Sequence, residues 1–98
     1  MAKGLWLVST TVRNTFFAEY VEAFHPWVES VGGSVFAKDI EAETVEGKCG
    51  KLGVIIEFPS KQAAIDAFNS LEYQEICKSR WANSTDTNIT IIDGGVTH

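Results

Sequence analysis

Four segments of the chain are rich in β-branched and other apolar residues, as is typical of β-strands, and the first of them contains neither glycine nor proline. They span residues 5–12, 34–40, 52–58 and 89–93. Residues 41–53 carry several glycines and charged side chains, so we expect them to connect the second and third strands as a hairpin. Within each strand, alternate side chains point to opposite faces of a sheet.

Between the first two strands, apolar residues recur with the spacing of an amphipathic α-helix. This stripe comprises Phe16, Phe17, Tyr20, Val21, Phe24, Trp27, Val28 and Val31. We expect Asn14 to cap the helix, and Gly32 with Gly33 to end it, because glycine adopts the left-handed C′ conformation at little cost. Pro26 removes one helical hydrogen bond and is expected to kink the helix midway.

The part of the chain after the third strand predicts two more helices. Ser60 is a favourable N-cap for the first, and Ser70 for a further short helix. Polar residues 83–88 are expected to form a loop before the last strand. The order β-α-β-β-α-β predicts an α+β, ferredoxin-like fold with a four-stranded antiparallel sheet, in which residues 1–98 form a single domain.

The pattern on the strands also bears on assembly. Helices cover only one face of such a sheet, and the other face would be polar if it met water. Here that second face is mixed: apolar at Leu5, Leu7 and Ile55, but polar at Ser9, Thr11 and Glu57. A mixed face suits a partner sheet that encloses a partly polar space. We therefore infer a homodimer joined through its sheet faces.

Charge and composition exclude several classes of partner. Thirteen acidic and eight basic residues give a net charge of −5, which repels phosphate backbones, so we expect no nucleic-acid binding. No apolar run approaches the roughly 20 residues of a membrane span.

The first residues do not resemble a secretion signal, so a cytoplasmic protein is expected. Cys49 and Cys77 fit neither a redox nor a zinc spacing and are expected to be free thiols.

Glu57 is the most unusual polar residue, because it lies in the most apolar of the expected strands. An unpaired charge buried there would be costly. The side chain either reaches solvent, pairs with a cation such as Arg80 or Lys38, or acts as a cavity carboxylate that orients a polar ligand group. In the last case it would lie on the second face, inside the barrel of the dimer, and Tyr73 and Arg80 would be its nearest candidate neighbours.

The other candidates for ligand contact are Tyr20, His25, Trp27, Tyr73 and Arg80. Tyr73 and Arg80 lie two turns apart on one helix face, where they either contact a ligand or serve packing and a surface ion pair. Tyr20 and Trp27 are expected in the core or in a cavity wall. His25 is either a structural or surface residue or a general base. One internal histidine with scattered carboxylates cannot form a zinc site, so we expect neither metal nor cofactor.

Several short motifs occur in a recognisable order along the chain. They are Gly4-Leu5-Trp6-Leu7, Gly32-Gly33, Glu46-Gly47, Ile55-Ile56-Glu57-Phe58-Pro59-Ser60, Ala63-Ala64, Ser70-Leu71-Glu72-Tyr73-Gln74, Arg80 and Asp93-Gly94. In this combination the sequence resembles the family called domain of unknown function 1330, in the dimeric α/β-barrel superfamily. The resemblance covers nearly the full chain. It implies a ferredoxin-like protomer whose sheet closes a barrel with the sheet of a second copy, and it implies no settled activity.

Three functions remain open at this point. The first is a dimeric module that binds a small organic molecule in the barrel cavity. The second is a cofactor-independent oxygenase- or isomerase-like enzyme, by analogy with other barrels of that superfamily. The third is a structural or interaction protein whose barrel is filled by its own side chains.

Overall fold

The computed structural model describes residues 3–13 and 17–95. In these ranges the chain forms a four-stranded antiparallel sheet with the strand order β2-β3-β1-β4. The strands are β1 (Gly4–Val12), β2 (Ser34–Asp39), β3 (Leu52–Phe58) and β4 (Ser84–Asp93). This is the ferredoxin-like α+β architecture that the order of elements predicts.

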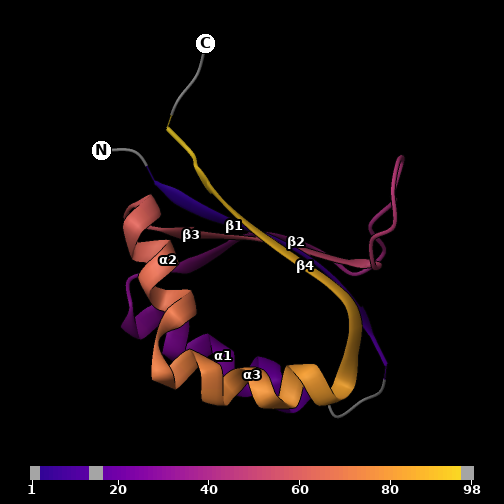
Figure 1. The fold of residues 1–98 in the computed structure, drawn as a ribbon, viewed down its shortest axis with the longest axis horizontal. Coiled ribbons are helices and arrows are strands. Elements are labelled where there is room, and N and C mark those ends of the chain that lie inside the picture. The colour runs from indigo at the N-terminus through magenta and orange to yellow at the C-terminus, as the bar shows by residue number, and fades with distance from the viewer. Residues whose placement is uncertain (1–2, 14–16, 96–98) are drawn as a thin grey trace.

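The helices of the described residues lie on one side of this sheet (Figure 1). They are α1 (Phe17–Ser30), α2 (Lys61–Asn69) and α3 (Leu71–Asn83). α1 and α3 contact each other, whereas α2 packs against β1, β3 and β4. Across the described ranges, no helix has both the length and the apolar character needed to cross a membrane.

The starts of the second and third helices have the predicted caps. The hydroxyl of Ser60 accepts a hydrogen bond from the backbone N–H of Ala63 at 3.0 Å. The hydroxyl of Ser70 accepts one from the backbone N–H of Tyr73 at 3.2 Å. Each serine thus satisfies a backbone donor that has no partner inside its helix.

The end of α1 is also as predicted. Gly32 has φ 80°, a value that favours glycine, and the N–H of Gly33 donates to the carbonyl of Val28 at 2.8 Å. The start of the helix is a different case, because the expected cap Asn14 and the first apolar residue of the stripe, Phe16, lie outside the described residues.

Two expectations for the C-terminal part of the chain are wrong. Most of residues 83–88 belong to β4, which begins at Ser84, and the helix before it is not short but continues to Asn83. The polar start of β4 pairs with the end of β1, and the hydroxyls of Thr10 and Thr87 share a hydrogen bond of 2.7 Å. Pairing with a neighbouring strand therefore outweighs the local polar composition.

Trp6 of β1 lies at the centre of the hydrophobic core and is fully buried. Its indole Nε1 donates to the carbonyl of Ala64 at 2.9 Å, which ties β1 to α2. Its ring also lies within 6.4 Å, centroid to centroid, of the rings of Phe24, Trp27, Phe58, Phe68 and Tyr73. One side chain thus connects the sheet with all three helices.

We predict that Trp6→Phe lowers the free energy of unfolding by about 2 to 4 kcal/mol, because it leaves a void and removes the hydrogen bond to Ala64. The same substitution at Trp81, which is 56% exposed, is the matched control and should change it by no more than about 0.5 kcal/mol. Urea denaturation of the two variants measures both values. Equal effects would contradict the central role of Trp6.

Candidate ligand-binding cavity

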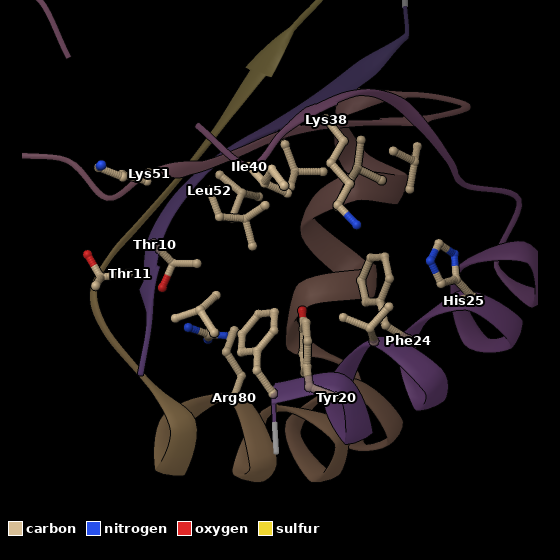
Figure 2. Close-up of a pocket in the computed structure, with 17 residues that line it drawn as sticks. Thr10, Thr11, Tyr20, Phe24, His25, Lys38, Ile40, Lys51, Leu52 and Arg80 are labelled. Atoms are coloured by element: carbon tan, nitrogen blue, oxygen red, sulfur yellow. The ribbon is translucent and has the colours of Figure 1, made fainter. Parts of the chain in front are cut away.

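The side chains of β1 that face the helices differ in size, and they fill the space between the sheet and the helices to different extents. The large Trp6 fills it beside α2, and the next residues on that side are the smaller Val8 and Thr10. At the end of β1 away from Trp6, a cavity of about 480 Å³ lies between the sheet and α1 (Figure 2). Its volume is within the range of about 300–1,000 Å³ usual for ligand pockets.

The walls of the cavity are mainly apolar. The sheet contributes Val8, Val35, Leu52, Val54 and Ile56, and α1 contributes Phe17, Val21 and Phe24. Polar residues line the cavity at a few points: Thr10, Tyr20, His25, Lys38, Lys51 and Arg80. Figure 2 shows the ammonium group of Lys51 directed away from the cavity. An apolar cleft with a few convergent polar groups is the usual form of a small-molecule site.

Arg80 is the most deeply buried of the cations, since its side chain on α3 is only 5% exposed. Its Nη2 donates to the thiol sulfur of Cys77 at 3.6 Å, and its Nε has no hydrogen-bond partner among the described residues. Burial alone would lower its pKa, but the neighbouring Tyr73, Cys77 and Tyr20 outweigh that effect and raise the pKa above its ordinary value. The guanidinium therefore remains charged.

The two tyrosines of the chain form a buried pair beside Arg80. Their hydroxyls lie 2.9 Å apart in a hydrogen bond, with Tyr20 on the cavity wall and Tyr73 fully buried behind it. Burial raises the pKa of Tyr20 to about 12. Burial also raises the pKa of Tyr73, and Tyr20 raises it further. Both side chains are therefore neutral phenols at physiological pH.

The structure brings together some of the candidates from the sequence and separates others. Tyr20, His25 and Arg80 line the cavity, and His25 is exposed. Tyr73 does not line the cavity, but its hydroxyl is hydrogen-bonded to that of Tyr20, which does. Trp27 is a core residue, 6% exposed, whose ring centroid lies 4.9 Å from that of Tyr73.

Glu57 lies elsewhere, which corrects the expectation that Tyr73 and Arg80 are its neighbours. Its cross-strand partners are Leu5 and Ser34, on the helix-free face of the sheet. The cavity lies on the helix-covered face, because strand alternation turns residues 54 and 56 of β3 toward the helices. It is therefore a different space from the barrel cavity expected between the sheets of two copies. The alternative ion pairs of Glu57 are not formed either, since in the described ranges only Lys78 and Glu75 form a salt bridge.

Lys38 also lines the cavity, which regular strand alternation does not predict. Regular alternation from Val35, which faces the helices, would turn Lys38 to the opposite face of β2. An irregularity between Val35 and Ala37 shifts the register, so that Val35 pairs with Ile56 but Lys38 pairs with Val54. The bulge returns Lys38 to the cavity side of the sheet. No local sequence signal marks this extra residue.

The described residues contain no group of three or more His, Cys, Asp and Glu side chains that could hold a metal ion. Cys49 is exposed and Cys77 is buried, and both are free thiols, as predicted. The groups that the cavity offers to a small molecule are hydroxyls, cations and apolar side chains.

The fold and the cavity define a ferredoxin-like α+β protein with an internal pocket. The chain belongs to the family described as Domain of unknown function (DUF1330), whose family model matches residues 3–95. Comparison with curated proteins yields no match.

Solved structures of similar fold are known from several bacteria. A protein of unknown function from Rhodopseudomonas palustris has a TM-score of 0.76 at 19% identity, over 98% of this chain and 85% of that one. A protein from Nitrosomonas europaea, provisionally described as an antibiotic biosynthesis monooxygenase, has a TM-score of 0.60 at 12% identity, over 95% and 90% of the two chains. A third, described as dimeric and ferredoxin-like, from Bacteroides fragilis, has a TM-score of 0.54 at 11% identity, over 93% and 95%. At these identities the likeness shows the fold.

The tyrosine pair makes a prediction for alkaline pH. The chain has only two tyrosines, so its phenolate absorbance reports on Tyr20 and Tyr73 alone. Because burial raises the pKa of Tyr20 from 10.0 to about 12, the folded protein should show no phenolate signal near pH 10, whereas the urea-unfolded chain should titrate there. A folded-state titration near pH 10 would contradict the buried pair.

The same shift fixes the sign of the effect on stability. Between pH 10 and about 12 the unfolded chain has lost the Tyr20 proton that the folded chain still holds. The free energy of unfolding should therefore fall as the pH rises through this window, and the contribution is fully present below it. Tyr20→Phe should weaken this dependence, which urea denaturation at several pH values measures.

Proposed function

We propose that the protein is a homodimeric binding protein for a small organic molecule, which occupies the cavity between the sheet and α1. The observation that carries the proposal is the cavity of about 480 Å³, apolar in its walls and entered by the buried cation of Arg80. A protein with a purely structural role would be expected to fill such a space, because interiors pack closely and empty volume is destabilising. The cavity thus favours a ligand over the structural alternative.

The helix-free face of the sheet supports the homodimer. Leu7 and Ile92 on this face are each more than one-third exposed, and Leu5 is the cross-strand partner of Ile92. A second copy that covered this face would bury these apolar side chains. The structurally similar protein from Bacteroides fragilis is described as dimeric, which supports a dimeric state for this chain.

A cofactor-independent oxygenase is the second candidate. It is favoured by the similar folds of the proteins from Nitrosomonas europaea and Caulobacter crescentus, both provisionally described as antibiotic biosynthesis monooxygenases. Tyr20 is a poor base because of its raised pKa, which leaves His25 as the cavity side chain of the type most often used as a general base. Oxygen uptake with aromatic substrates and no added cofactor, lost in His25→Gln, would favour this candidate.

We predict that the cavity binds the uncharged fluorescent probe N-phenyl-1-naphthylamine and that Val35→Trp abolishes this binding by filling the space. Val35 lines the cavity and is 37% exposed, so the larger ring can be accommodated without unfolding. Phe36→Trp is the matched control, because it places an indole on the neighbouring residue, which is 65% exposed and does not line the cavity. Fluorescence titration measures binding, and circular dichroism checks the fold.

Phe36→Trp should bind the probe as the unchanged protein does. No binding to the unchanged protein, or equal loss in both variants, would contradict a ligand site in this cavity.

For the homodimer, we expect light scattering after size exclusion to give twice the chain mass of 10.8 kDa. Leu7→Glu should shift the protein to the monomer, because it places a charge in the apolar part of the interface. Leu71→Glu on α3, at a side chain that is 85% exposed, should leave the mass unchanged. A monomer at micromolar concentration would contradict the proposed assembly.

A further inference from the structure

The charges around the cavity are all of one sign. Three of the eight basic residues of the chain, Lys38, Lys51 and Arg80, line it, although the protein as a whole has a net charge of −5. None of the thirteen acidic residues lines it, and all thirteen lie within the described ranges. The cavity is therefore a cationic site inside an acidic protein.

Arg80 lacks the counter-charge that buried guanidinium groups normally have. Taking a charge out of water is costly unless a group of opposite charge and further hydrogen bonds replace the lost hydration. Within the described residues, Arg80 Nη2 donates to the weakly accepting thiol of Cys77, the neighbouring Tyr20 and Tyr73 are uncharged phenols, its Nε has no partner, and no carboxylate forms a salt bridge with it. An unpaired cation that is 95% buried on a cavity wall marks a place for an anion from outside the chain.

The geometry around Arg80 fits one end of an elongated molecule. Figure 2 shows Arg80 entering the cavity from α3 on one side of the Tyr20 hydroxyl, which is directed into the space between the layers, and the ammonium group of Lys38 coming from the sheet on the other side. Because Tyr20 remains protonated, its hydroxyl adds a neutral polar group without competing for the cation. The remaining walls, among them Phe17, Phe24 and Val54, are apolar and suit a hydrocarbon or aromatic body.

We propose that the cavity binds an organic acid, in which an apolar body lies between the sheet and α1 and a carboxylate pairs with Arg80, while Lys38 adds a second positive charge on the cavity wall. A planar guanidinium can donate two parallel hydrogen bonds to one carboxylate, which makes arginine selective for this group. This inference rests on the proposed ligand-binding function and names its ligand class.

The test uses displacement of N-phenyl-1-naphthylamine by 2-naphthoate and by 2-naphthamide, which have nearly the same shape and differ in charge. We expect naphthoate to displace the probe at a concentration at least about tenfold lower than naphthamide. Arg80→Met, which keeps the length of the side chain but removes its charge, should abolish this preference and leave the affinity for the uncharged probe within about twofold. Lys78→Gln is the matched control: it removes an exposed cation of the same helix, and the preference should be retained.

Two further measurements keep the test decisive if Arg80→Met does not fold. Lys38→Gln, at an exposed residue of the cavity wall, should reduce the preference several-fold. Raising the salt concentration should weaken naphthoate by screening the exposed Lys38, and it should leave naphthamide unchanged. If the probe binds but the two competitors are equally effective, the organic-acid assignment is wrong and the binding function stands. If neither probe nor competitor binds, the proposed function itself fails.

Discussion

The packing of Trp6 determines the rest of this structure, because it holds the two layers together at one end only. Its indole occupies the space between β1 and α2, and its Nε1 is fixed to the carbonyl of Ala64. Beyond it, Val8 and Thr10 on the same side of β1 are too small to reach α1. Trp6 therefore fills the space beside α2, and an open cavity remains between the sheet and α1 at the opposite end. Along β1, the large Trp6 belongs to the core, whereas the smaller Val8 and Thr10 line the cavity.

The sequence predicts the architecture well because the fold depends on periodic signals. The third strand has the predicted bounds, Leu52–Phe58, since it is rich in Val and Ile and lies between a glycine-rich segment and Pro59-Ser60. The serine caps of α2 and α3 were predictable for the same reason, because capping is a local interaction of one side chain with the next turn. The start of β4 was not, because its polar residues are held by pairing with β1, and no local pattern encodes such pairing.

The site was predicted only in part, and the failures have physical causes. Tyr20, His25 and Arg80 were candidates and do line one cavity, whereas Glu57 was assigned correctly to the second face of the sheet but linked to side chains on the other. A bulge in β2 turns Lys38 toward the helices, and strand alternation cannot reveal it. The burial of Arg80 likewise depends on how closely α3 packs against α1, a tertiary property that helix periodicity leaves open.

The two proposed roles of the protein use opposite faces of the same sheet. The cavity lies between the sheet and α1, and the proposed contact with a second copy lies on the helix-free face. Strand alternation separates them, because neighbouring residues such as Ile55 and Ile56 of β3 point to different faces. A dimer joined through the helix-free faces would therefore leave the cavity of each protomer on the side of the sheet that is turned away from the partner sheet. Any effect of a bound ligand on assembly would have to pass through the sheet itself, by a change in its twist or in the bulge that positions Lys38.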